Sequence, residues 1–291
     1  MRSILFINIL IILFCAECSL FARDYKKTEE MINTILAEEN DNRTRTEDAG
    51  EIKIVQPAEE EEIPARKKIE EGKSPVMAGE DALLLKNGIE LYNSGMMDSS
   101  FSAFNELLSN YPASVFLDNA RIWAGRIYLN KNNYDEAINL FSAVSDNSGE
   151  YPASLFYTGE ALHNKGDLNR AIETFKKLSN AYPENEYSDK SLLIVGKIYL
   201  RLNKGYQALE SAITLIKHYS NRDTVDDAYY LMAKIYQVDA LLKDHESARK
   251  IYKNFLNKAD SGEKFFKDSP LLPVVKKDLD NLERLYFRLE K

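Results

Sequence analysis

The apolar and polar positions of this chain follow one frame that returns five times between residues 81 and 257. Each unit carries a small residue in its first half, and the steps between successive small residues are 37, 34, 37 and 37 residues: Gly88, Gly125, Gly159, Gly196 and Ala233. An aromatic residue or leucine follows three positions later, and a small residue about twelve positions later. An aromatic or small apolar residue then stands about sixteen positions later. This period is typical of an array of helix pairs.

The small residues have a packing role in this frame. Two antiparallel helices approach closely only where their side chains are small, so we expect Gly159 and Ala171 to let the helices of one unit nest. We expect Tyr128 and Phe141 to fill the seam between units. One helix pair cannot bury its own apolar face, whereas a stack of pairs buries a continuous core. The sequence therefore predicts an all-α solenoid of about five helix-turn-helix units.

The frame also predicts where the units start and where they are irregular. The predicted starts are Asp81, Asp118, Pro152, Asp189 and Asp226. The first unit is the least regular and has Ser100 where the small residue of the second helix falls. The fifth unit gains about three residues at positions 238–244, which predicts longer helices or a longer turn.

The residues of this frame resemble those of the tetratricopeptide repeat, or TPR. The second unit has Gly125, Tyr128, Tyr134, Ala137 and Phe141, and the third has Gly159, Leu162, Gly166, Ala171, Phe175 and Pro183. The resemblance implies a right-handed solenoid whose first helices line a concave face. It also implies that this face binds other proteins.

Residues 1–22 have the pattern of an export signal. Arg2 precedes an apolar run over residues 4–14, which is shorter than the roughly 20 residues that a membrane span needs. Cleavage after Ala22 would give a mature chain without cysteine. Alternatively, Cys15 or Cys18 carries a lipid and attaches the protein to a membrane, although Phe14 and Glu17 are larger than the residues that usually precede a lipidated cysteine.

Residues 23–80 have few apolar side chains, many charges and the acidic run 59–62. Such a composition buries too little apolar area to offset the entropy of ordering, so we expect a largely disordered acidic tether with a short helix at residues 25–36.

At the C-terminal end, the sequence of residues 258–291 predicts a linker followed by a capping helix. Val275, Leu279 and Leu282 have helical spacing there, and the alternative is a helix that docks on another protein.

No pattern of residues in this chain predicts catalysis. The three histidines, His163, His218 and His245, fall in different units, and no HExxH motif or phosphate-binding glycine loop is present. We therefore expect no metal, no cofactor and no enzyme activity. The net charge of −8 disfavours nonspecific binding of nucleic acid.

Candidate partner-binding residues are those that the TPR frame places on the concave face. They are Tyr92, Arg126, Asn130, Phe156, Asn164, Lys197, Arg201, Tyr230 and Lys234. The four cations among them favour an acidic or extended peptide segment of a partner protein. Alternatively, they are ordinary solvated side chains, and Glu160 interrupts the row.

The segments 110–114 and 181–185, together with the export signal, resemble the TPR proteins of the Gram-negative-type bacterial envelope, a group that includes BamD and CpoB. The resemblance implies a non-catalytic scaffold that binds partner proteins in the periplasm or at the outer membrane. A lipoprotein of β-barrel assembly like BamD and a cell-wall coordinator like CpoB are both alternatives. A module that binds glycan strands through Trp123, Phe156 and Tyr230 is another. The long tether departs from BamD, and the absence of sustained heptads in residues 23–80 departs from CpoB.

Overall fold

The computed structural model describes residues 79–287, which lie in a compact unit spanning Ala78–Lys291. The predicted export signal, the acidic tether up to residue 78, and the two cysteines lie outside the described residues. The described residues form helices and no strand. None of the helices in this part of the chain is both long enough and apolar enough to cross a membrane.

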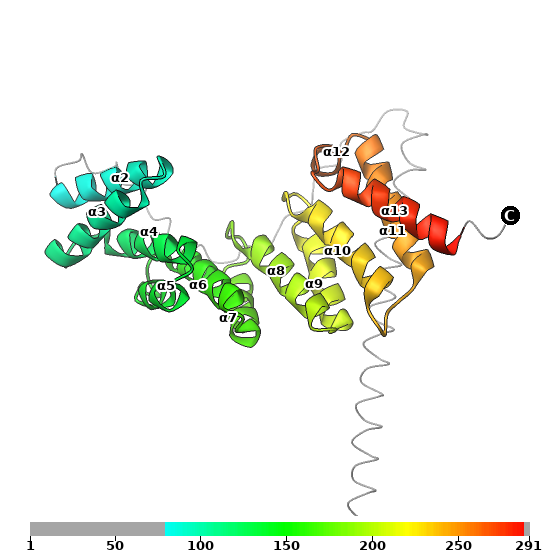
Figure 1. Ribbon diagram of the computed structural model, residues 1–291, viewed down its shortest axis with the longest axis horizontal. Helices are drawn as coiled ribbons and strands as arrows, with labels where there is room; N and C mark the ends of the chain where they lie inside the picture. The colour runs from blue at the N-terminus through cyan, green and yellow to red at the C-terminus, as the bar shows by residue number, and fades with distance from the viewer. Residues whose placement is uncertain (1–78, 288–291) are drawn as a thin grey trace, which may run out of the picture. The chain divides into compact units, whose positions relative to one another are not determined.

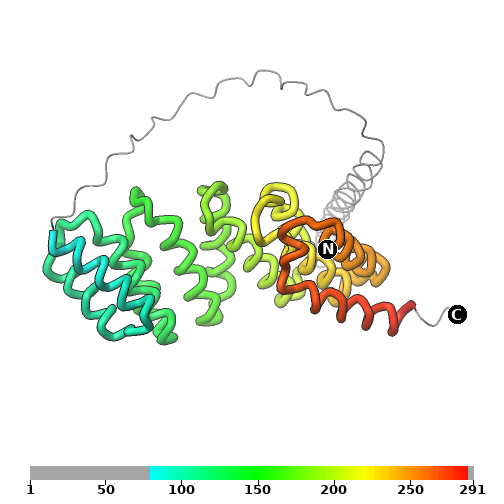
Figure 2. The backbone as a smooth tube through the Cα atoms, turned by 90° about the horizontal axis from the view of Figure 1, so that it is seen from above, coloured from blue at the N-terminus to red at the C-terminus, as the bar shows by residue number. Residues whose placement is uncertain are grey.

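Ten of the helices form five successive pairs (Figure 1). The pairs are α2 (Glu80–Asn93) with α3 (Met97–Asn110), α4 (Leu117–Asn130) with α5 (Tyr134–Ser142), α6 (Tyr151–Lys165) with α7 (Leu168–Ala181), α8 (Ser188–Arg201) with α9 (Gly205–His218), and α10 (Val225–Val238) with α11 (His245–Asp260). Each helix packs on its predecessor and its successor, as the tube in Figure 2 shows. Each first helix begins one residue before its predicted unit start. The predicted all-α TPR solenoid is confirmed.

In each of the first three pairs, a phenylalanine of the second helix packs directly against a glycine of the first. A Cβ atom at Gly159 would lie 2.6 Å from the Phe175 ring, and one at Gly88 would lie 2.5 Å from the Phe104 ring. Phe141 occupies the same place over Gly125. Phe141 was expected in the seam between units. Its ring instead lies inside its own pair and also stacks on Tyr157 of the next pair, with the ring centroids 5.6 Å apart.

In the fourth pair, the space over the glycine is filled by a residue of the fifth pair. Ala212 stands sixteen positions after Gly196, where the earlier pairs have phenylalanine. The space over Gly196 is filled by Leu231 of α10, whose Cδ2 atom would lie 2.7 Å from a Cβ atom at Gly196. This substitution couples the fourth and fifth pairs directly.

The insertion in the fifth pair lengthens the turn, which covers the six residues between Val238 and His245. Buried Asp239 organises this turn by accepting hydrogen bonds from the backbone N–H groups of Leu241 and Leu242, at 2.9 and 3.0 Å. Its carboxylate also lies against Gly205, the first residue of α9, where the N-terminal end of the helix dipole favours a negative charge.

Aspartates at four of the five predicted unit starts tie their first helix to a loop that follows the pair, whereas the third unit starts at Pro152. Asp118 accepts a hydrogen bond from the backbone N–H of Ser145 at 3.4 Å. Ser114 donates to Asp81 at 2.6 Å, and Thr224 donates to Asp189 at 2.9 Å. Ser269 donates in the same way to Asp226. The structure gives all four of these aspartates a hydrogen bond from a loop outside their own helix.

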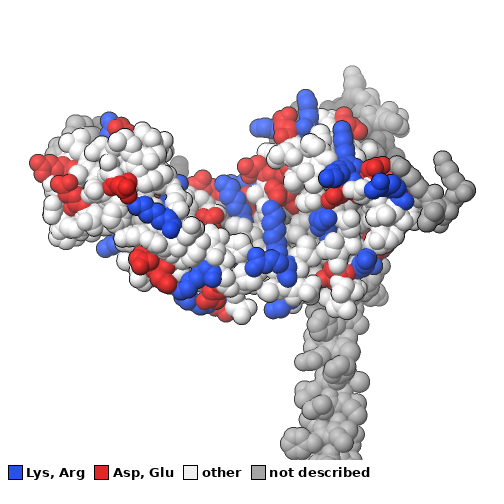
Figure 3. Space-filling model, in the orientation of Figure 1, with Lys and Arg blue, Asp and Glu red and all other residues white. Residues whose placement is uncertain are grey.

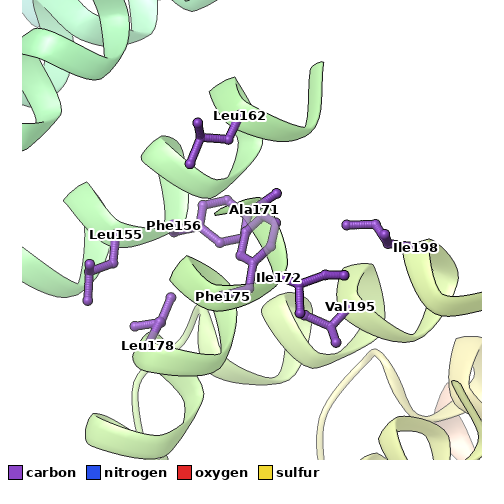
Figure 4. Close-up of a cluster of buried hydrophobic side chains, with 9 residues drawn as sticks. All are labelled: Leu155, Phe156, Leu162, Ala171, Ile172, Phe175, Leu178, Val195 and Ile198. Carbon is purple, nitrogen blue, oxygen red and sulfur yellow. The ribbon is translucent and has the colours of Figure 1, made fainter. Parts of the chain in front are cut away.

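The core is formed by residues that face between adjacent helices. Figure 4 shows one cluster, in which Phe156 of α6 and Phe175 of α7 lie beside Val195 and Ile198 of α8. The Phe156 and Phe175 centroids are 5.9 Å apart. Because the cluster takes side chains from two consecutive pairs, the pairs cannot separate without exposing it to water.

The last helices close the C-terminal end of the described array. After α12 (Lys264–Lys267), α13 (Leu272–Tyr286) packs on α11 and buries Val275, Leu279 and Leu282, as the capping helix was expected to do. Tyr286 stacks on His245 with centroids 3.7 Å apart. Helix α11 continues to Asp260, so the connecting segment begins three residues later than the predicted linker.

Candidate partner-binding surface

Position nine of each unit, counted from the predicted start, lies on the same side of every first helix. The residues there are Ile89, Arg126, Glu160, Lys197 and Lys234. Figure 3 shows one face of the structure, where positive and negative side chains are interspersed. The contacts of each charged residue in this row therefore determine whether its charge is available to a partner.

Arg126 lies among three aromatic rings that come from three successive first helices. Its guanidinium carbon is 4.2 Å from the centroid of Trp123, 5.0 Å from that of Tyr92 and 5.1 Å from that of Tyr157. We call Arg126 and these three rings the Arg126 cage. Tyr92 is itself held by the side-chain amide of Asn130, which donates to its hydroxyl oxygen at 2.9 Å. A guanidinium stacked on aromatic faces gains cation–π attraction and a fixed orientation.

The surroundings of the Arg126 cage are partly shielded from water. Burial raises the pKa of Tyr157 far above its usual range. Burial also raises the pKa of Glu160, against the opposing attraction of Arg126. Within residues 79–287, Arg126 forms no ion pair. A half-buried cation therefore has aromatic neighbours and one acidic side chain nearby, but no bonded counter-ion.

Lys197 and Lys234 are already paired with carboxylates. Lys197 contacts Asp227 of the next first helix at 2.8 Å, and Lys234 contacts Asp278 of α13 at 3.4 Å. Tyr230 also donates its hydroxyl to Asp278, at 3.0 Å. Two of the predicted binding residues, Tyr230 and Lys234, thus bind the capping helix α13.

Phe156 is buried, so its side chain is not on the exposed surface of the first helices. It is only 8% exposed and stacks on Tyr187 with centroids 4.8 Å apart, because position five of the third unit faces the core between α6 and α8. Asn164 and Arg201, in contrast, are exposed. Arg201 lies near His163. The pKa of the His163 imidazole is lowered mainly by burial and additionally by the positive charge of Arg201.

The aromatic residues proposed for glycan binding do not form a common platform. Trp123 contacts the Arg126 guanidinium and also stacks on Phe104, with the Trp123 and Phe104 ring centroids 6.3 Å apart. Phe156 is buried, and the Tyr230 hydroxyl is bound to α13. Across residues 79–287, no group of three or more histidine, cysteine or acidic residues is placed to hold a metal ion.

Sequence reasoning missed Tyr157, although a signal for it exists. Position six carries an aromatic residue in two consecutive units, Trp123 and then Tyr157. Aligned repeats would have placed both rings on the same side of their helices, on either side of Arg126. The structure brings the predicted residues together in two groups: Tyr92, Arg126 and Asn130 in one, and Tyr230 and Lys234 in the other.

Two families have models that match this chain. The model of the family described as "Outer membrane lipoprotein" (YfiO) matches residues 148–261, and a tetratricopeptide-repeat model matches residues 119–146. A curated relative, the outer membrane protein assembly factor BamD of Caulobacter vibrioides, is 30% identical over 88 residues. That match covers 30% of this chain and 29% of the relative, so less than a third of the length of BamD is matched.

Solved structures with the same fold are TPR proteins. A tetratricopeptide repeat protein from Parabacteroides merdae has a TM-score of 0.54 at 13% identity, with 70% of this chain and 73% of that chain covered. TPR-like repeats of a putative kinesin light chain from Podosopora anserina give 0.51 at 14% identity, with coverage of 65% and 100%. MamA gives 0.50 at 16% identity, with coverage of 62% and 95%. These likenesses concern the fold alone. Together with the sequence matches, they show that the chain is a tetratricopeptide-repeat protein that resembles BamD.

Proposed function

We propose that this protein is an exported, non-catalytic scaffold of the bacterial envelope that binds partner proteins through its first helices. The observation that carries this proposal is that three side chains on the first helices of repeats two, three and four have no ion pair and no contact with the capping helix among the described residues. They are Arg126, Asn164 and Arg201. At repeat five the corresponding surface is taken by α13. The usable surface is therefore the part that lies before the cap.

The outer membrane is the location that the comparisons favour. The matching family is described as an outer membrane lipoprotein, and its model covers the third, fourth and fifth helix pairs. The apolar run near the N-terminus supplies the export signal that this location needs. Mass spectrometry of the mature N-terminus tests the mode of attachment. Diacylglycerol on Cys15 or Cys18 would indicate anchoring, whereas a mature chain starting at Arg23 would indicate a soluble periplasmic protein.

The more specific proposal is a role in the assembly of outer-membrane β-barrels, because the curated relative is named an outer membrane protein assembly factor. Depletion of the protein in its native cells should then lower the amounts of several β-barrel proteins in the outer membrane together. Unchanged β-barrel levels after depletion would contradict this role. They would leave a more general envelope scaffold, such as a coordinator of the CpoB kind.

Photo-crosslinking tests the binding surface itself. A benzoylphenylalanine at Asn164 or Arg201, both exposed on first helices, should give discrete adducts with partner proteins in intact envelopes. Glu173 and Glu210 are exposed on second helices and provide matched control positions. If the control positions give the same adducts at the same yield, partners do not select the first-helix face and the proposal is wrong.

A further inference from the structure

We propose that Arg126 is the anchor of this scaffold and that it binds an aspartate or glutamate side chain of an extended acidic segment in the partner. This inference rests on the proposed function and names the chemistry that the binding surface recognises. Three independent features of the structure support it: the missing counter-ion, the fixed orientation of the guanidinium, and the neighbouring polar side chains.

The missing counter-ion is visible when the repeats are aligned. Lys197 stands at position nine of its unit and pairs with Asp227, at position two of the next unit. Arg126 also stands at position nine, but position two of its next unit is Ala153. Lys234 receives its carboxylate from Asp278 of the capping helix. Among residues 79–287, Arg126 therefore lacks the intramolecular carboxylate that the two later cations of this row possess.

The orientation of the guanidinium is fixed by rings from α2, α4 and α6. Stacking occupies the flat faces of a guanidinium and leaves its N–H edges, which match the two oxygens of a carboxylate. Because Tyr92 and Trp123 also pack edge to face at 5.1 Å, the cage is largely formed before a ligand arrives. Such preorganisation lowers the entropic cost of binding.

The neighbouring side chains favour an extended peptide over a single small acid. Asn130 and Asn164 occupy position thirteen of consecutive units, and Arg201 occupies that position in the next. Amide side chains can bind the peptide groups of an extended segment, and Arg201 supplies a second exposed cation. Glu160 is the opposing charge in this region, since it attracts Arg126 without forming an ion pair. Its removal should therefore strengthen the binding of a carboxylate.

The chain offers a built-in probe for this site. Trp123 is its only tryptophan and lies 4.2 Å from Arg126, so its fluorescence reports on the Arg126 cage alone. The titrant is a hexaglutamate peptide with both termini blocked, so that only side-chain carboxylates are present, and hexaglutamine is the control. In the purified full chain, hexaglutamate should change the Trp123 emission saturably, and hexaglutamine should not. Calorimetry of the same samples gives the affinity independently of the fluorophore.

Variants then assign the effect to Arg126. Arg126→Gln should weaken hexaglutamate binding about tenfold or more, because it removes a charge-assisted bidentate contact. Lys197→Gln removes the same charge from a paired lysine and should change the affinity less than about twofold. Glu160→Gln should bind more tightly. Circular dichroism confirms that each variant is folded.

Two results would overturn this inference. One is an equal affinity of the wild type for hexaglutamate and hexaglutamine, and the other is an unchanged hexaglutamate affinity in Arg126→Gln. The proposed function is judged separately by the adducts formed at Asn164. If adducts persist while the peptide fails to bind, the scaffold stands and the Arg126 anchor is wrong. If no first-helix position gives adducts, the scaffold itself is wrong.

Discussion

The ring of Phe175 occupies the space that a side chain at residue 159 would need. A Cβ atom at Gly159 would lie 2.6 Å from the ring, inside any normal contact distance. The two residues belong to α6 and α7 and set how closely these helices approach. An added methyl group therefore has to displace either the Phe175 ring or one of the two helices.

Gly159→Ala should therefore destabilise the protein by about 1–3 kcal/mol, the usual cost of overpacking a filled core. The measurement is the free energy of unfolding in urea. Gly149→Ala is the matched control, because a Cβ atom at Gly149 meets no other atom within 4 Å. Equal stabilities of the two variants would show that the Gly159 contact does not determine the spacing of the helices.

Thr224 should be another stabilising residue, through a buried hydrogen bond between repeats. Its hydroxyl donates to one carboxylate oxygen of Asp189, and the other oxygen of that carboxylate has no hydrogen-bond partner in the described structure. Thr224→Val leaves a buried carboxylate without this donor and should cost about 1–3 kcal/mol. Thr214→Val is the control, since the Thr214 hydroxyl donates only to the Glu210 carbonyl of its own helix. A loss no larger than that of the control would contradict this role.

The stability of the C-terminal repeats should depend on pH through Asp226. Burial raises the pKa of Asp226 above its ordinary value of 3.8, and the hydrogen bond from Ser269 opposes this rise. The folded state consequently holds this proton more tightly than the unfolded state. Stability due to the protonated carboxyl is fully present below pH 3.8 and is lost as the pH rises through the folded pKa.

Asp226→Asn removes this titration and still offers Ser269 an acceptor oxygen. Its free energy of unfolding, compared with that of the wild type, should therefore shift in favour of the variant as the pH rises from about 4 to 7. Unfolding in urea at several pH values measures the difference. A difference that stays constant, or one that shifts toward the wild type, would mean that the pKa of Asp226 is not raised.

The repeat frame was readable from the sequence because close helix crossings demand small residues at fixed intervals. The register of Gly88, Gly125 and Gly159 placed every first helix within one residue of its observed start. The same frame could not say which side of a first helix faces the core. Phe156 was therefore assigned to the surface although it packs on Tyr187.

The ion pairs and the Arg126 cage depend on more than one repeat. Lys197 and Asp227 are thirty positions apart, a pairing that has no local sequence signal. The Arg126 cage takes rings from three helices, so it follows only from the stacking geometry. One difference between the repeats does have a sequence signal. Position ten carries the charged residue Glu90 in the first unit and the apolar residue Ile198 in the fourth, and Glu90 is exposed whereas Ile198 is buried.

The last prediction concerns the polar contacts between the capping helix α13 and α10. Asp278 accepts the hydroxyl of Tyr230 and pairs with the half-buried Lys234, so Asp278→Ala removes both contacts and leaves the lysine without its counter-ion. Because α13 packs mainly on α11, the loss should stay local, and backbone hydrogen exchange should accelerate in α11 and α13 while α4 to α6 keep their protection. Exposed Lys277 of the same helix provides the control Lys277→Ala, which should leave the exchange pattern unchanged. Acceleration throughout the array would instead show that the cap stabilises all repeats as one cooperative unit, and unchanged exchange in α13 would show that its apolar contacts suffice to hold it.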